Sequence, residues 1–170
     1  SLGLVGSEMC IRDSPDPLPP WRERELSVQP PIGPRDIMTK PLAIGVAGLG
    51  TVGAGVLALL RDNAATVAAR AGRPIAVTAV SSRDRTKDRG VSLAGLRWYE
   101  DPVALAHDPN VDIVVETIGG TQGPPADLVR AALSAGKPVV TANKALLATH
   151  GSELGRFAEA RGVPLMYEAA

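Results

Sequence analysis

Three glycines at a fixed spacing form the clearest chemical motif of the chain. Gly48, Gly50 and Gly53 stand in the segment Gly-Leu-Gly-Thr-Val-Gly, after a short apolar run and before an alanine-rich stretch. Between a strand and a helix, such a turn binds the pyrophosphate of a dinucleotide, because glycines permit the tight turn and a close approach of backbone to ligand. The N–H groups of the first helical turn, including those of Thr51 and Val52, then face the anion. The motif predicts dinucleotide binding, and a turn that serves packing alone is the alternative.

The end of the second expected strand indicates which dinucleotide binds. Residues 75–81 are followed by Ser82 and Arg83, without the Asp or Glu that binds the ribose 2′-hydroxyl of NAD. An arginine there suits a 2′-phosphate, and a serine can donate to it. Three further basic residues follow: Arg85, Lys87 and Arg89. The pattern predicts NADP, with NAD possible, although a solvated charged loop is the other interpretation because Asp84 and Asp88 alternate with the basic residues.

Two later strand ends carry further candidates. Ligands of open parallel sheets bind at the carboxyl ends of the strands. Thr117 ends one strand and precedes two glycines, so we expect it along the nicotinamide half of the cofactor. Lys144 follows another strand and is expected near the reacting carbonyl or the nicotinamide ribose. The alternative is a plain turn at the glycines, with Asn143 as a helix N-cap and Lys144 in solvent, but a cation there opposes the helix dipole and favours a functional role.

Alternating strands and helices must carry these residues. Short apolar runs predict strands over 42–47, 75–81, 96–99, 111–117, 138–142 and 163–167, and helical patterns cover 52–70, 102–107, 124–135 and 145–161. Near-continuous apolar strands are typical of a parallel sheet with helices on both faces. Gly136 and Gly162 stand where two helices should end. The pattern predicts an α/β fold, a Rossmann-type doubly wound parallel sheet of about six strands.

Composition excludes several other classes of function. Eighteen Lys and Arg residues balance eighteen Asp and Glu residues, so no basic surface for nucleic acid or an anionic membrane is expected. One cysteine, Cys10, cannot form an intrachain disulfide, which predicts a reducing, cytoplasmic location. Residues 41–60 carry no charge and are long enough for a membrane span, but their five glycines favour strand, turn and helix. We therefore expect no nucleic-acid partner and no membrane.

The ends and the isolated aromatic and imidazole side chains carry weaker signals. Residues 1–37 are rich in proline and lack hydrophobic periodicity, so we expect a disordered or non-native extension before one domain over 38–170. His107 and His150 have no partners at triad spacing and are interpreted as ordinary residues at helix ends. Trp98 and Tyr99 are expected to be packing residues of an edge strand.

Four segments together resemble one enzyme family. They are AGLGTVGAGV at 47–56, VVETIGG at 114–120, AGKPVVTANKALLA at 135–148 and MYEAA at 166–170. Over residues 38–170 the chain resembles the N-terminal, cofactor-binding part of homoserine dehydrogenase. That family reduces L-aspartate 4-semialdehyde to L-homoserine with NAD(P)H, in the biosynthesis of threonine, methionine and isoleucine. The resemblance therefore implies an oxidoreductase acting on a small molecule.

The resemblance also implies roles for single residues. Thr117 and Ile118 flank the cofactor, Lys144 contacts cofactor and substrate, and Glu168 begins a monovalent-cation site for sodium. The turn from Gly48 to Gly53 holds the pyrophosphate.

The substrate and dimerisation domain, with the main proton-donor lysine, is expected to lie beyond residue 170. This chain alone should then be inactive, and the full-length protein should be a homodimer or homotetramer. Two alternatives remain: a stand-alone dinucleotide-binding regulatory module, and a dehydrogenase of another small amino-acid-derived carbonyl compound.

Overall fold

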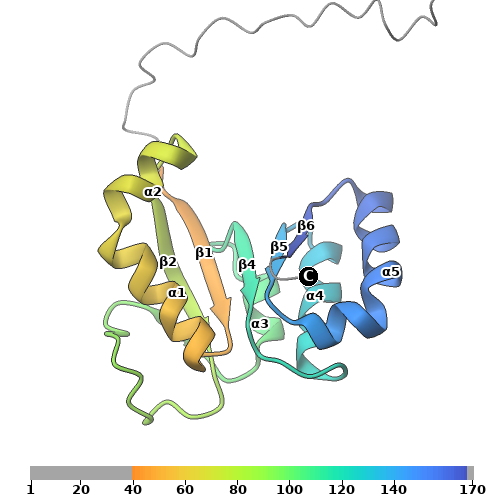
Figure 1. Ribbon diagram of the computed structural model, residues 1–170, viewed down its shortest axis with the longest axis horizontal. Helices are drawn as coiled ribbons and strands as arrows, with labels where there is room; N and C mark the ends of the chain where they lie inside the picture. The colour runs from red at the N-terminus through yellow and green to blue at the C-terminus, as the bar shows by residue number, and fades with distance from the viewer. Residues whose placement is uncertain (1–39, 168–170) are drawn as a thin grey trace, which may run out of the picture. The chain divides into compact units, whose positions relative to one another are not determined.

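A computed structural model describes residues 40–167 and contains one parallel sheet in that range (Figure 1). Its strands are β1 (Leu42–Ala47), β2 (Ile75–Ser81), β3 (Arg97–Tyr99), β4 (Ile113–Glu116), β5 (Val139–Thr141) and β6 (Leu165–Tyr167). They lie in the order β3-β2-β1-β4-β5-β6, and each neighbouring pair is parallel. This order reverses beside β1, as in doubly wound dinucleotide-binding folds. The predicted Rossmann-type fold of six strands is confirmed.

Helices cover the sheet from two sides. They are α1 (Thr51–Asp62), α2 (Ala64–Ala71), α3 (Val103–His107), α4 (Pro124–Ser134) and α5 (Lys144–Arg161). One core joins α3, α4 and α5 to the sheet through fully buried residues such as Leu105, Leu128 and Leu146. A second core joins α1 to the opposite face through Ile44, Val46 and Leu57. The grouping follows from right-handed crossovers, which place the connections on opposite faces of the two halves.

An irregularity in β2 changes which of its side chains face α1. The register runs from Ile44 opposite Val77 to Gly45 opposite Ala79, so Thr78 is an extra residue. Its hydroxyl donates to the carbonyl oxygen of Asn110 at 2.9 Å. Val77 and Val80 both pack in the core beside α1 although they are three positions apart in the sequence. A regular strand would have put them on opposite faces.

The helix expected over residues 52–70 is two helices, so that prediction was wrong. The chain bends by 85° between α1 and α2, at Asn63. The backbone N–H and the side-chain amide of Asn63 both donate to the carbonyl oxygen of Leu59. These two bonds end α1. Asparagine competes with regular helix through such local hydrogen bonds. Within residues 40–167 no single helix is long and apolar enough to cross a bilayer, and only this bent pair has the required length and composition.

Most other elements lie where they were expected; β1 and β2 have the predicted bounds, and the other four strands are shorter. The run 111–117 forms a strand only over Ile113–Glu116, and 163–167 only over Leu165–Tyr167. Gly162 ends α5 in the left-handed conformation, and Gly136 follows the C-cap of α4 with φ of 72°. His107 does end α3, but His150 lies in the middle of α5, which contradicts its expected place at a helix end.

A buried carboxylate ties elements together at the amino edge of the sheet. Asp108 is 4% exposed and accepts hydrogen bonds from Arg97 (Nη1, 2.6 Å) and the Tyr99 hydroxyl (3.1 Å). The backbone and side-chain N–H groups of Asn110 donate to it at 2.9 and 3.1 Å. Burial acts to raise the pKa of Asp108, but these hydrogen bonds and the charge of Arg97 outweigh it and hold the pKa below its ordinary value. The ring of Tyr99 packs against the core, as expected of an edge strand.

Replacing this carboxylate should reduce stability above its titration range. A lowered pKa in the folded state stabilises the protein above about pH 4, the pKa of an unfolded aspartate, and this contribution is lost as pH falls through the folded pKa. We expect Asp108→Asn to lower the free energy of unfolding by about 1–3 kcal/mol at pH 7. Urea unfolding from pH 7 to pH 3 should show the difference from wild type shrinking below about pH 4. Glu159→Gln, at an exposed acid of α5, is the control, and a constant difference across this range would contradict the assignment.

Candidate dinucleotide-binding site

The predicted site residues meet at the carboxyl edge of the sheet. Loops after β1, β2, β4 and β5 lie along this edge, which is the lower edge in Figure 1. They carry the turn from Gly48 to Gly53, then Ser82 with Arg83, Thr117 with Ile118, and Lys144. Residues spread over almost a hundred positions are thus gathered at the reversal of strand order, where ligands of such sheets bind.

Two glycines of the turn are sterically required. Gly48 has a φ of 93°, and a Cβ there would lie 2.7 Å from the carbonyl carbon of Thr117. A Cβ on Gly53 would lie 1.8 Å from the carbonyl oxygen of Gly48. Real Cβ atoms do not approach that closely, so any side chain at Gly53 would push α1 away from β1. This supports the predicted packing role of the third glycine.

The middle glycine and the start of α1 leave room for an anion. A Cβ on Gly50 would meet no atom within 4 Å, and both Thr51 and Val52 are exposed. Ala54 makes the first intrahelical bond, from its N–H to the carbonyl oxygen of Gly50. The N–H groups before it have no acceptor within the helix, and no side chain caps them. The residues present therefore fit a pyrophosphate, which these N–H groups would hold.

Thr117 is bound to the glycine turn. Its hydroxyl lies 2.6 Å from the carbonyl oxygen of Gly48 and 3.0 Å from that of Ala47, and its backbone N–H donates to Ala47 at 2.8 Å. The side chain thus closes the turn from the β4 side. Ile118, the next residue, is 36% exposed and is free to contact a ligand along this edge.

The loop after β2 is braced by Arg89. Its guanidinium donates from Nε to the carbonyl oxygen of Leu49 (3.2 Å) and from Nη2 to the hydroxyl of Ser82 (3.0 Å). It also donates to the carbonyl oxygens of Asp84 and Lys87. Arg89 therefore connects this loop to the glycine turn. Arg83 is exposed.

The acid closest to the end of β2 is used within its own loop. Oδ1 of Asp84 accepts from the backbone N–H and the hydroxyl of Thr86, each at 2.8 Å, and from the N–H of Lys87 at 3.2 Å. The Thr86 bonds hold the pKa of Asp84 below its ordinary value. The guanidinium carbons of Arg85 and Arg89 lie 5.9 and 5.5 Å from the ring centroid of Trp98. Cations thus gather where an NAD site would carry an acid.

Lys144 is the first residue of α5 and is exposed. Asn143 caps the helix, because its Oδ1 accepts from the N–H of Leu146 at 3.1 Å, so the structural interpretation of Asn143 is confirmed. Its Nδ2 donates to the carbonyl oxygen of Gly120 at 2.8 Å. This bond connects the start of α5 to the loop after β4. The cap and a functional Lys144 are compatible, since the lysine side chain takes no part in the cap.

Sequence reasoning assigned no role to Glu116, the last residue of β4. Its side chain is fully buried and accepts hydrogen bonds from the N–H of Ile118 (2.7 Å) and the hydroxyl of Thr141 (2.5 Å). The signal was present in the sequence, because an acid within an apolar strand is seldom buried without partners.

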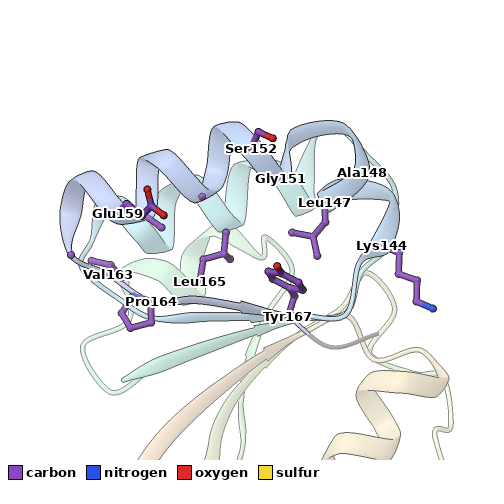
Figure 2. Close-up of a pocket in the computed structure, with 13 residues that line it drawn as sticks. Lys144, Leu147, Ala148, Gly151, Ser152, Glu159, Val163, Pro164, Leu165 and Tyr167 are labelled. Carbon is purple, nitrogen blue, oxygen red and sulfur yellow. The ribbon is translucent and has the colours of Figure 1, made fainter. Parts of the chain in front are cut away.

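An apolar groove with a volume of about 980 Å³ lies between α5 and β6. Figure 2 shows Leu147, Leu165 and Tyr167 between the helix and the strand, with Lys144 extending from the start of the helix. The glycine turn does not line this groove. Glu168, the expected sodium ligand, lies outside the described residues, and within residues 40–167 no group of three His, Cys, Asp or Glu side chains is arranged to hold a metal.

Comparison with known proteins identifies the family. The model of the homoserine dehydrogenase NAD-binding domain matches residues 48–168, from the first glycine of the turn to the residue after the last strand. The chain belongs to this family. A nicotinamide dinucleotide is therefore the class of cofactor that the domain binds.

Curated homoserine dehydrogenases are similar over the same region. The protein of Neisseria gonorrhoeae is 43% identical over 131 residues, which are 77% of this chain and 30% of the relative. That of Corynebacterium glutamicum is 47% identical over 130 residues, or 75% of this chain and 29% of the relative. The chain thus spans about 30% of the length of these homoserine dehydrogenases.

Solved homoserine dehydrogenases have a similar fold in this region. The Thiobacillus denitrificans structure is 44% identical with a TM-score of 0.70, and the match covers 76% of this chain and 30% of that one. A Staphylococcus aureus homoserine dehydrogenase is 37% identical with a TM-score of 0.69, covering 76% and 33%.

The contact between Gly53 and Gly48 can be tested with a matched pair of substitutions. Gly53→Ala should lower the free energy of unfolding by about 3 kcal/mol, because the added methyl overlaps the carbonyl oxygen of Gly48. NADPH binding should weaken more than about tenfold, since the turn moves with the helix. Gly55→Ala, two residues along α1 in open space, should be neutral or stabilise by up to about 1 kcal/mol. Urea unfolding and calorimetric titration measure both effects, and equal behaviour of the two variants would contradict the steric argument.

Proposed function

We propose that this chain is the cofactor-binding part of an NADP-preferring homoserine dehydrogenase, which converts L-aspartate 4-semialdehyde and NADPH to L-homoserine and NADP⁺. The observation that carries this proposal is the family match over residues 48–168, which include the glycine turn, the basic loop and Lys144 at one edge of the sheet. The chain spans about 30% of the length of these relatives, so the activity we propose is that of the whole enzyme.

Different residues of the chain bind different parts of the dinucleotide. The N–H groups of Thr51 and Val52 hold the pyrophosphate at the start of α1. Ile118, after β4, contacts the nicotinamide half, and the hydroxyl of Thr117 keeps the glycine turn closed, as its bond to Gly48 supports. The bound dinucleotide supplies the hydride that reduces the aldehyde carbon. Lys144 orients the substrate beside the cofactor, while the main proton donor comes from a lysine outside this chain.

NADP preference rests on the loop after β2. Asp84 uses Oδ1 within the loop, so the position that binds a ribose hydroxyl in NAD sites is left to Ser82 and Arg83. Arg83 has an exposed guanidinium suited to a 2′-phosphate. Arg89, whose hydrogen bonds run to the protein, keeps the loop against the glycine turn.

The family resemblance supports three further proposals about the full-length enzyme. The full-length enzyme carries a monovalent-cation site for sodium that begins at Glu168. The enzyme forms a homodimer or homotetramer, and it acts in the cytoplasm in threonine, methionine and isoleucine biosynthesis.

Cofactor preference can be measured with two arginine variants. Arg83→Ala should weaken NADPH binding about tenfold or more, because a charge-assisted hydrogen bond is lost, and should leave NADH binding nearly unchanged. Arg89→Ala should weaken both, because it releases the loop from Leu49. Arg61→Ala, in the last turn of α1, is the control. Calorimetric titration with both nucleotides gives the ratios, and equal losses in Arg83→Ala would remove the assignment.

The activity can be tested in a chimera. Residues 40–167 would replace the matching region of the Neisseria gonorrhoeae homoserine dehydrogenase, to which the chain is 43% identical. We expect the chain alone to bind NADPH without turnover, and the chimera to reduce NADP⁺ when homoserine is added. Lys144→Ala in the chimera should abolish turnover and retain NADPH binding.

A folded chimera that binds NADPH but does not oxidise homoserine would contradict the proposed reaction. It would favour a regulatory dinucleotide-binding module or another carbonyl substrate. A spectrophotometric assay that follows NADPH formation with a panel of small amino-acid-derived alcohols separates these two outcomes.

A further inference from the structure

A closed circuit of hydrogen bonds surrounds Glu116 at the carboxyl edge of the sheet. Oε1 of Glu116 accepts from the N–H groups of Ile118 at 2.7 Å and Gly119 at 3.4 Å. Oε2 accepts from the hydroxyl of Thr141 at 2.5 Å. That hydroxyl oxygen accepts in turn from the N–H of Asn143 at 3.0 Å, and Asn143 donates from Nδ2 to the carbonyl oxygen of Gly120 at 2.8 Å. The circuit returns to the loop in which it began.

The circuit joins the two segments that carry the nicotinamide-side candidates. One is the loop of residues 117–120, and the other is the start of α5, where Asn143 precedes Lys144. The strands beneath them are adjacent, with Glu116 opposite Thr141 in the register of β4 and β5. A change in the position of the Glu116 carboxylate therefore moves both segments together.

The cost of burying Glu116 indicates that its role exceeds packing. The residue is 0% exposed, and its donors in the described part of the chain are neutral N–H and O–H groups rather than a cation. A buried carboxylate without a cation loses solvation that hydrogen bonds must replace, and an apolar side chain would avoid this cost. The neighbouring inward residue of β4, Val114, is apolar and equally buried. The acid lies where two ligand-facing loops must be held together.

We propose that Glu116 is a positioning residue, whose buried carboxylate fixes the loop at Ile118 and, through Thr141 and Asn143, the first turn of α5 that carries Lys144. It sets the distance between the nicotinamide-side loop and the lysine without touching either ligand. This inference rests on the proposed dinucleotide function. It predicts that the nicotinamide half of the cofactor depends on the circuit and the adenosine half does not.

Thr141 offers the sharpest test, because valine has nearly the shape of threonine and lacks the hydroxyl. The full 170-residue chain would be titrated calorimetrically with NADPH and with 2′,5′-ADP, which lacks the nicotinamide half. We expect Thr141→Val to weaken NADPH binding about tenfold, the scale of one buried unpaired polar group, and to change 2′,5′-ADP binding less than about twofold. Thr141→Ser, which keeps the hydroxyl, should restore NADPH binding to within about threefold of wild type.

Glu116→Gln provides a second variant with a different defect. Glutamine can still accept from Ile118, but its amide N–H groups then face the Thr141 hydroxyl, whose proton loses the carboxylate oxygen that accepts it. NADPH binding should weaken, again with little change for 2′,5′-ADP. Amide hydrogen exchange without ligand should be faster at Ile118 and Asn143 in Thr141→Val than in Thr141→Ser.

The outcomes separate the proposals. Equal losses for NADPH and 2′,5′-ADP, or no loss for either, would overturn the positioning role and leave dinucleotide binding intact. Wild-type protein that binds neither ligand would refute the proposed function. In that case unchanged amide exchange in Thr141→Val would separately refute the circuit, and faster exchange would support it.

Discussion

The close contact between the glycine turn and the loop after β4 is the constraint on which the site depends. The carbonyl oxygen of Gly48 receives the Thr117 hydroxyl at 2.6 Å, and the same oxygen leaves no space for a side chain on Gly53. Helix α1 therefore lies directly against the end of β1, and no side chain caps its first N–H groups beside the open space at Gly50. The other loops of the site are held at the same edge of the sheet. Arg89 holds the loop after β2, and the Glu116 circuit holds the loop after β4 and the start of α5.

The two halves of the edge are stabilised by different chemistry. On the β2 side, a guanidinium donates to backbone carbonyl oxygens, and the loop is exposed and charged. On the β5 side, a buried carboxylate accepts from backbone N–H and hydroxyl groups. The difference suits the ligand, because a nucleotide phosphate is solvated and anionic, whereas hydride transfer needs water excluded near the nicotinamide. The Gly48 turn stands between the two environments.

Local patterns predicted the fold and the positions of the site loops, because apolar strands and glycine turns depend on neighbours in sequence. They predicted less where distant residues decide the outcome. Asn63 divides one expected helix into two through its own bonds to Leu59, and periodicity alone does not detect that break. Thr117 is predicted to lie along the cofactor, but the sequence did not predict the bond of its hydroxyl to Gly48, across 69 residues. The role of Glu116 depends on Thr141, which lies opposite it on the adjacent strand β5 and is distant in sequence.

The extra residue Thr78 in β2 determines which face of the sheet each side chain occupies from there to the start of the following loop. Val77 and Val80 share a face only because the irregularity shifts the alternation by one position, so Ser82 begins its loop half a period later than a regular strand would place it. Strand length and loop sequence are therefore coupled. A loop transplanted here from another dehydrogenase, to exchange one nucleotide for the other, would present its side chains to the wrong side unless the donor strand carried the same one-residue correction.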